Sequence, residues 1–405
     1  MAIADERRGA VGGEEADVSM DTLRILFVHN AYQQRGGEDS VVDDEIRLLR
    51  EHGHVVELYR RDNHDIESMG KLAAARDTLW SARTVHEVLA VLSRFHPDVI
   101  HVHNTFPLIS PSLYWAAGKR QVPVVQTLHN FRLLCPQAML LREGKVCEDC
   151  VGKLPWRGVA RRCYRGSLPQ SAALAGMLVL HRGLGTYTNK VTRYIALNDF
   201  CREVFVRGGL PANRLCVKPN FVADPGFSSS TRNGFLYVGR LSAEKGIATL
   251  ATAFAASPGQ MCEVIGTGPA DGEIGRLPNL KMTGWQDSAY ITERMKDSLA
   301  LVMPSLWYEN FPRTLVEAFA CGLPVIASRL GAMAALIQDG KTGLLFEPGN
   351  AEDLAAKTAW AQAHPDEMRD MGEAARREYE SKYTPQHNLE KLLAVYHEAM
   401  ADNAT

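Results

Sequence analysis

Short apolar runs alternate with longer stretches of helical spacing along most of the chain. In residues 38–52, apolar side chains recur three or four positions apart, as they do on the buried face of a helix. Between such stretches lie β-rich runs at residues 23–28, 55–59, 99–102, 122–127 and 194–197. Strand and helix alternating in this way predict right-handed crossovers and a parallel sheet covered by helices on both faces.

The alternation pauses at residues 218–220 and in the polar stretch 224–233, where we place a domain boundary. A second series follows, with β-rich runs at residues 234–238, 263–265, 299–303, 324–327 and 343–346 and terminal helices at 353–363, 366–383 and 388–400. The pattern predicts an α/β protein with two Rossmann-like domains, at residues 23–222 and 223–383. Since ligands bind at the carboxyl ends of parallel strands, the predicted site is a cleft between them.

The composition agrees with two globular domains. A chain of 405 residues is too long for one ordinary core, and its 46% apolar and 23% charged content is typical of soluble proteins. A net charge of −2 gives no global field that would attract nucleic acid, so no nucleic-acid partner is expected. No apolar run reaches the roughly 18–20 residues of a spanning helix. Residues 1–22 are acidic, which predicts a disordered tail rather than a signal peptide and hence a cytoplasmic protein.

The strongest local motif places two cations between a strand and a helix. Arg240 and Lys245 follow the run 234–238 and precede a stretch of helical spacing. Two cations beside a helix N-terminus form a site for a diphosphate. Cations in a loop are also commonly solvated, so the spacing alone leaves both interpretations open.

A second motif carries two carboxylates, Glu309 and Glu317, on either side of Pro312. Proline suits the first turn of a helix, which places Glu317 in the helix and Glu309 in the loop before it. Carboxylates at these positions can accept hydrogen bonds from sugar hydroxyls, and the backbone N–H groups of Asn310 and Phe311 could meet an anion. By itself, the pair is also compatible with an exposed helix residue and a loop charge.

Together the two motifs resemble the retaining glycosyltransferases of the GT-B fold. The similarity is to the large family 4-like group that includes bacterial lipopolysaccharide, capsule, mannosyl and sucrose-type transferases, and it extends from residue 23 to about residue 400. Further matching pieces are Arg35-Gly36-Gly37-Glu38, His101-Val102-His103-Asn104, Thr127-Leu128-His129-Asn130, Val217-Lys218-Pro219-Asn220-Phe221 and Val264-Ile265-Gly266-Thr267-Gly268-Pro269. The resemblance implies two Rossmann-like domains facing across a cleft, with a helix at 384–405 returning to the first domain.

The resemblance also implies a role for each matching residue. Arg240 and Lys245 would hold the donor pyrophosphate, Glu309 the hydroxyls of the transferred sugar and Glu317 those of the ribose. Gly37 would let the first loop approach the donor, and His129 would lie near the reacting carbon. The backbone of Asn310, Phe311 and Pro312, with Thr314 nearby, would lie along the sugar and phosphates. Asn310 is a departure, because many relatives have glycine there.

The implied reaction transfers a sugar with retention from a nucleotide diphosphate sugar, most plausibly of UDP or GDP, to a polysaccharide or glycolipid acceptor of the cell envelope. The sequence contains no Asp-x-Asp triplet, so no divalent metal or other cofactor is expected in catalysis. A nucleotide-sugar epimerase of the same architecture and an inactive scaffold protein are the alternatives.

Four of the eight cysteines lie within an insert at residues 135–165: Cys135, Cys147, Cys150 and Cys163. Four thiolates that include one Cys-x2-Cys pair could hold a structural zinc ion. Unpaired thiols, a disulfide and an iron–sulfur site are the other interpretations. The insert is also basic, so it could contact anionic lipid at the inner face of the membrane, or be an ordinary solvated loop.

Overall fold

Each half of the chain forms a six-stranded parallel sheet. The computed structural model describes residues 22–33, 36–227, 232–274 and 277–404. The first sheet has the order β2-β1-β3-β4-β7-β8, with the strands β1 (Arg24–Ala31), β2 (Val55–Asp62), β3 (Val99–Asn104), β4 (Val124–Thr127), β7 (Arg193–Ala196) and β8 (Leu215–Val217). Its helices are α1 (Gly37–Glu51), α2 (Lys71–Leu79), α3 (Ala82–Phe95), α4 (Ser112–Lys119), α5 (Trp156–Ala160), α6 (Leu168–Gly183), α7 (Thr186–Asn189) and α8 (Asp199–Arg207). A small hairpin, β5 (Leu141–Arg142) and β6 (Lys145–Val146), projects from the insert.

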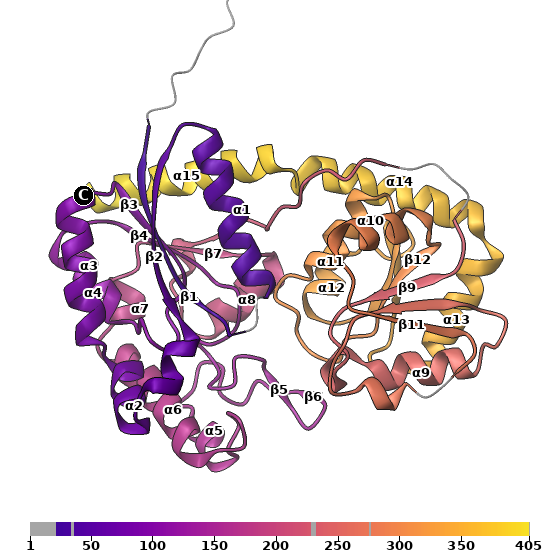
Figure 1. The fold of residues 1–405 in the computed structure, drawn as a ribbon, viewed down its shortest axis with the longest axis horizontal. Coiled ribbons are helices and arrows are strands. Elements are labelled where there is room, and N and C mark those ends of the chain that lie inside the picture. Colours follow the sequence, from indigo (N-terminus) through magenta and orange to yellow (C-terminus); the bar gives the residue numbers. More distant parts are fainter. Residues whose placement is uncertain (1–21, 34–35, 228–231, 275–276, 405) are drawn as a thin grey trace, which may run out of the picture.

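The second sheet has the order β11-β10-β9-β12-β13-β14. Its strands are β9 (Phe235–Val238), β10 (Cys262–Ile265), β11 (Leu280–Gly284), β12 (Ala300–Met303), β13 (Val325–Ser328) and β14 (Gly343–Phe346). The helices of this half are α9 (Ile247–Ala255), α10 (Ser288–Asp297), α11 (Arg313–Ala320), α12 (Gly331–Leu336), α13 (Ala351–Ala363), α14 (Pro365–Lys382) and α15 (Pro385–Ala404). The predicted pair of parallel-sheet α/β domains is therefore confirmed (Figure 1).

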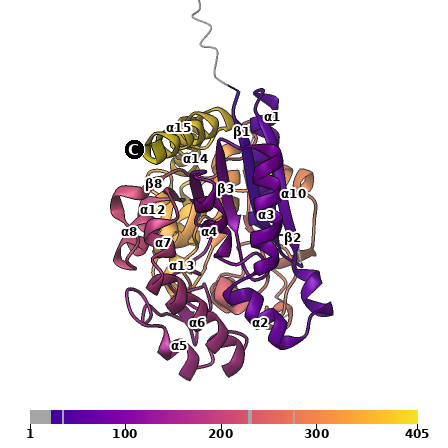
Figure 2. The ribbon, with the colours of Figure 1, turned by 90° about the vertical axis from the view of Figure 1, so that its left-hand side faces the viewer.

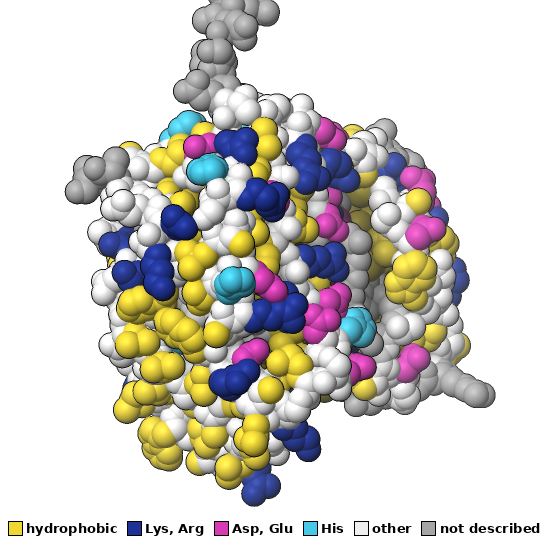
Figure 3. Space-filling model, turned by 60° about the vertical axis from the view of Figure 1, so that its left-hand side comes forward, with side chains coloured by type: hydrophobic (Ala, Val, Ile, Leu, Met, Phe, Trp, Pro, Cys, Tyr) yellow, Lys and Arg dark blue, Asp and Glu magenta, His cyan; other side chains and the backbone are white. Residues whose placement is uncertain are grey.

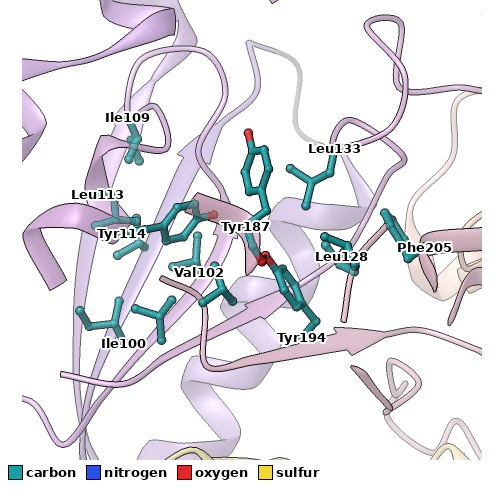
Figure 4. Close-up of a cluster of buried hydrophobic side chains, with 14 of the residues drawn as sticks. Ile100, Val102, Ile109, Leu113, Tyr114, Leu128, Leu133, Tyr187, Tyr194 and Phe205 are labelled. Carbon is teal, nitrogen blue, oxygen red and sulfur yellow. Dashed lines mark hydrogen bonds between the residues drawn. The ribbon is translucent and has the colours of Figure 1, made fainter. Parts of the chain in front are cut away.

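Both faces of each sheet are buried, and successive side chains of a strand point alternately into the two cores. In β1, Leu26 and Val28 join one core and Ile25 and Phe27 join the core on the other face. Figure 4 shows the first of these cores, where Tyr194 donates from its hydroxyl to the carbonyl of Tyr187 at 2.7 Å. A buried tyrosine needs such a partner for its polar end.

The last helix crosses back to the first half of the molecule. α14 packs in the second half, where Ala375, Tyr379 and Tyr383 belong to the core beside α11. α15 instead places apolar side chains in the core on one face of the first sheet: Leu389, Leu392, Leu393, Val395, Tyr396 and Ala399. Figure 1 shows α14 along the second half and α15 along the first, and Figure 2 shows both helices at the same edge of the molecule. The predicted return of the C-terminal helix is thus confirmed.

Some single elements differ from the sequence pattern. Helical spacing over residues 171–190 favours one helix, but α6 ends at Gly183 and a separate turn, α7, follows Gly185, whose φ of 65° is left-handed and interrupts helical geometry. Strands β8 and β11 were not predicted. Both lie at sheet edges, and β11 has two exposed side chains in five residues, so it lacks an apolar run. Of the predicted acidic tail, residues 1–21 lie outside the described part of the chain.

Candidate functional site between the two domains

Loops that follow three strands pack together at the carboxyl edge of the second sheet. Gly266 has a φ of 141°, and a Cβ there would lie 1.9 Å from the carbonyl oxygen of Gly239. A Cβ at Gly246 would lie 1.8 Å from the carbonyl oxygen of Pro304. Only glycine permits approaches this close. These contacts hold segment 240–245 against the ends of β10 and β12.

Lys245 and Glu309 are in direct contact. Lys245 ends a short 3-10 turn just before α9, and its ammonium donates to Glu309 Oε1 at 2.6 Å. The hydroxyl of Ser305 and the indole N–H of Trp307 donate to the same oxygen at 2.8 and 3.2 Å. Because the Glu309 side chain is only 8% exposed, salt screens this ion pair little. Two residues predicted for the site are therefore held together and fixed in position.

Arg240 has different surroundings. Its side chain is exposed and lines a cavity of about 410 Å³ together with residues of the first domain, namely Tyr32, Gln33, Gly36, Asn63, Ile66, Phe106, Pro107, Tyr164 and Arg165. Lys245 and Glu309 are not among the described residues that line it. The cavity thus lies where a second-domain cation faces the loop after β1. Arg35, in that loop, lies outside the described residues.

The segment after β12, residues 308–313, docks onto the first domain, and we call it the docking segment. The ring of Tyr308 packs edge-on against Phe200 with 4.7 Å between ring centroids. The side-chain amide of Asn198, which caps α8, donates to the carbonyl of Asn310 at 2.6 Å. Arg313 forms an ion pair with Asp44 of α1 at 3.0 Å. Three separate contacts therefore fix this segment across the domain interface.

The Asn310 side chain is engaged in the same interface. The thiol of Cys201 lies 3.3 Å from Asn310 Oδ1 and 3.4 Å from its carbonyl oxygen. Asn310 is buried, so its polar groups require partners. Cys201 of α8 supplies one to the side chain, and the N-cap residue Asn198 supplies one to the carbonyl.

The other predicted residues of this segment lie at the start of α11. Pro312 is buried and precedes the helix as its N-cap rather than lying in its first turn. Phe311 packs edge-on against Tyr383, with 6.2 Å between centroids. Thr314 is half-buried, and Glu317 Oε1 accepts a hydrogen bond from Arg313 Nε at 3.0 Å. Glu317 is thus in the helix, as expected, and is paired with Arg313.

A buried polar network surrounds His129 in the first domain. His129 Nε2 lies 2.8 Å from His103 Nδ1, and His103 Nε2 lies 3.4 Å from Glu45 Oε2. Lys218 neutralises Glu45 with an ion pair of 2.7 Å. Within the described part of the chain, neither His103 Nε2 nor Glu45 Oε2 has a hydrogen-bond partner, so their contact is electrostatic. Between His103 Nδ1 and His129 Nε2 one ring donates and the other accepts, according to the tautomer.

Both imidazoles of this pair are neutral. Burial lowers the pKa of His103 well below its ordinary value, and the nearby His101 adds to the effect. Burial and, next, His29 lower the pKa of His129 to about 3. His129 therefore presents a neutral ring at the edge of the first sheet. Gly37, also predicted for the site, is exposed as the first residue of α1, and a Cβ there would have no heavy atom within 4 Å.

One group of side chains in the described residues has metal-ligand spacing: Glu45, His101 and His103. Both ring nitrogens of His101 are already hydrogen-bonded, to Tyr396 and Thr127 at 2.8 Å each. The ammonium of Lys218 already supplies the positive charge beside Glu45. A metal ion would displace these partners, so the group fits an internal hydrogen-bond network better than a metal site.

The four cysteines of the insert gather around a second, small cavity.

Sequence reasoning missed several residues that contact the site: Asp44 pairs with Arg313, Glu45 lies beside His103, Asn198 bonds to Asn310 and Tyr308 precedes Glu309. It also missed Glu38 as a titrating group. Tyr32 donates from its hydroxyl to Glu38 Oε2 at 2.8 Å. Burial raises the pKa of Glu38 to about 7, against the opposing influence of His29 and the Tyr32 hydrogen bond.

Comparison with known proteins identifies the family. The model "Glycosyl transferases group 1" matches residues 223–378, and "Glycosyltransferase Family 4" matches residues 35–224. Among solved structures, sucrose-phosphate synthase from Thermosynechococcus elongatus has a TM-score of 0.69 at 19% identity, covering 93% of this chain and 99% of that one. This chain belongs to the GT-B glycosyltransferases. The structure of Anabaena Alr3699/HepE in complex with UDP has a TM-score of 0.65 at 17% identity, covering 92% of this chain and 99% of that one.

Curated relatives match over shorter lengths. The sulfoquinovosyl transferase SQD2 of Arabidopsis thaliana is 33% identical over 36% of this glycosyltransferase, and the D-inositol 3-phosphate glycosyltransferase of Segniliparus rotundus is 27% identical over 72% of it. The chain spans 29% of the length of the first relative and 66% of the second.

The pKa of Glu38 predicts a dependence of stability on pH. The folded protein keeps this proton up to about pH 7, whereas the unfolded chain releases it near the ordinary value of 4.5. The free energy of unfolding should therefore fall as pH rises through that interval. Glu38→Gln should stabilise the protein at about pH 8 and have little effect at about pH 5, measured by urea denaturation. Glu51→Gln, an exposed substitution on the same helix, is the control. An equal effect of Glu38→Gln at both pH values would contradict the assignment.

Proposed function

We propose that this chain transfers a sugar, with retention of configuration, from a nucleotide diphosphate sugar to a polysaccharide or glycolipid acceptor, without a catalytic metal. The observation that carries the proposal is the cleft geometry. Arg240 lines the interdomain cavity, and Lys245 is fixed by Glu309 at the carboxyl edge of the second sheet. Both belong to the loop after β9, the place where open parallel sheets bind their ligands.

The chemistry follows from where charge develops. Breaking the sugar–phosphate bond leaves negative charge on the departing diphosphate and positive charge on the sugar. Arg240 and Lys245 supply fixed cations for the first, a function that a divalent metal performs in other sugar-nucleotide sites. Glu309 holds Lys245 and offers its second carboxylate oxygen to hydroxyls of the transferred sugar. Glu317 and the backbone of residues 310–312 bind the remaining hydroxyls and phosphates.

Retention is supported by the resemblance of the two motifs to those of retaining GT-B glycosyltransferases. The acceptor would attack from the side that the nucleotide leaves, so no covalent intermediate on the protein is needed. His129, which burial keeps neutral, would meet a hydroxyl of the sugar without adding positive charge near the reacting carbon. UDP is the favoured nucleotide, because the neighbour Alr3699/HepE binds UDP, and GDP is the alternative.

The acceptor side is proposed to lie against anionic lipid. Exposed apolar side chains project from the lower part of the first domain, with Leu72 at 88%, Leu154 at 65% and Trp156 at 63% exposure. Arg157 and Lys153 stand beside them, and Figure 3 shows apolar and basic side chains intermixed on this face. Such a surface suits peripheral binding at a membrane. Among the described residues, no helix is both long and apolar enough to cross a bilayer.

Replacing Arg240 tests the proposed function. Arg240→Ala should lower transfer on the order of a hundredfold or more, because the leaving diphosphate loses one of its two cations. The measurement is sugar transfer from the UDP- or GDP-sugar that gives the largest thermal shift in a donor screen. Arg369→Ala, in an exposed ion pair on α14, is the matched control and should keep normal turnover. Near-normal transfer by Arg240→Ala would refute the role, and conversion of donor without acceptor would indicate an epimerase.

A liposome flotation assay tests the membrane contact. The wild-type chain should float with vesicles containing anionic lipid and stay in the pellet fraction with neutral vesicles, because the basic side chains act within a Debye length. Leu154→Ser combined with Trp156→Ser should weaken flotation, whereas Trp360→Ser, a partly exposed tryptophan on α13 of the second domain, should not. Equal flotation with both kinds of vesicle would argue against an electrostatic contribution.

A further inference from the structure

The insert at residues 135–165 is built mainly of turns. Its regular elements are the hairpin β5–β6 and the five-residue helix α5. Among the described residues, five of the eight non-glycine residues with positive φ lie in it: Ala138, Leu140, Glu143, Arg162 and Arg165. Such backbone is unfavourable for residues with a Cβ and persists only where surrounding contacts fix it. The short helix and hairpin offer few such contacts, so a further contact, such as a shared metal ion, would stabilise the insert.

Its four cysteines lie around one cavity. Cys135, Cys147, Cys150 and Cys163 all line a space of about 20 Å³, and all four are free thiols. Cys135 and Cys150 are buried, and the other two are half-buried. A space of this size holds one water-sized body. It accommodates a single ion and is too small for an iron–sulfur cluster.

Cations lie around the cavity. Arg142, Arg157 and Arg161 line it together with the cysteines, and they pair with Glu143 and Asp149. Four thiolates around one divalent cation would leave two negative charges, which nearby guanidinium groups attract. The backbone N–H of Gly158 donates to the sulfur of Cys150, and the carbonyl of Gly158 accepts from the backbone N–H of Cys163. Hydrogen bonds of this kind orient metal ligands.

The sulfur atoms lie around the cavity but farther apart than the ligands of one zinc ion. No three of the four lie within 4.8 Å of one another, whereas sulfurs about 2.3 Å from a tetrahedral zinc ion stand roughly 3.8 Å apart. Cys147 and Cys163 are half-buried, so side-chain rotation can bring their sulfurs inward.

The loop between Cys147 and Cys150 reaches the docking segment. Glu148 accepts two hydrogen bonds from Arg207 of α8, at 2.7 and 3.0 Å, and one from the hydroxyl of Tyr308. Tyr308 is followed by Glu309, which holds Lys245. A rigid Cys147–Cys150 loop would therefore fix the position of Tyr308 and, through it, of Glu309.

We propose that Cys135, Cys147, Cys150 and Cys163 bind one zinc ion, and that this ion fixes the docking segment through Glu148 and Tyr308. Tyr308 is then a positioning residue for the donor site. The zinc site stands independently, whereas its effect on donor binding rests on the proposed function.

The metal content of the full chain tests the first part. The purified protein should contain about one zinc ion per chain by elemental analysis, and its Co²⁺ form should show the visible absorption bands of tetrahedral thiolate coordination. Cys147→Ser combined with Cys150→Ser should abolish both signals, whereas Cys216→Ser, outside the insert, should leave them unchanged. If the double variant fails to fold, Co²⁺ titration of metal-stripped wild type gives the same information. Metal-stripped protein that gives no thiolate bands with Co²⁺, or disulfides joining these cysteines, would overturn the site.

The coupling is tested separately with the fluorescence of Trp307, the indole that donates to Glu309. Stripping the metal from the wild type should change the emission of Trp307, identified by its loss in Trp307→Phe. In Tyr308→Phe, which keeps its zinc, stripping should have a much smaller effect. The KM for the nucleotide sugar should rise several-fold in Tyr308→Phe, whereas the acceptor KM should change little.

These readouts separate the two proposals. Unchanged emission on metal removal would overturn the coupling whether or not the chain transfers sugar. A metal-dependent emission change in a protein without transfer activity would leave the zinc coupling standing and reject the proposed function.

Discussion

The arrangement of the cleft depends on the docking of residues 308–313 onto the first domain. This segment starts from the carboxyl end of a second-domain strand, yet Tyr308, Asn310 and Arg313 each bond to the other domain. Because Glu309 lies between them, its carboxylate cannot move independently of the interface. The position of Lys245, bonded to Glu309, depends on the same contacts. A movement between the domains would thus displace the residues proposed to hold the donor.

Close backbone packing supports this arrangement from the opposite side. At Gly246 and Gly266 a methyl group would overlap a neighbouring carbonyl oxygen. The loop that carries Arg240 and Lys245 therefore packs closely against the ends of β10 and β12. In this position Lys245 bonds directly to Glu309. Preorganised charges of this kind need no reorganisation when negative charge develops nearby. The docking segment and the glycine contacts together give the rigidity that such a mechanism requires.

The fold could be predicted from the sequence because strand and helix periods are local properties. Several short elements escaped prediction, among them the edge strands β8 and β11 and the hairpin β5–β6; β8 has three residues, and β11 has no apolar run. Motif spacing also identified Lys245 and Glu309, whose contact the structure shows. Their supporting partners could not be found in this way, because they are distant in sequence. Asn198 and Asn310 are 112 positions apart, and Asp44 and Arg313 are 269 positions apart. No local signal marks such pairs.

The two domains divide the charges of the proposed reaction between them. Arg240 and Lys245, on the second domain, suit the departing diphosphate, whereas a cation near the sugar would oppose the positive charge that grows on its reacting carbon. The first domain places one cation, Arg165, at the same cavity as Arg240, but buries and pairs another: Lys218 is neutralised by Glu45 inside the sheet. Burial keeps the neighbouring His129 neutral, with a pKa of about 3. The buried network of lysine, carboxylate and imidazoles therefore adds no net positive charge to the first domain's side of the cleft. Their cost in desolvation is compensated by mutual pairing, and a hydrophobic replacement of Lys218 would leave Glu45 unpaired beside these rings.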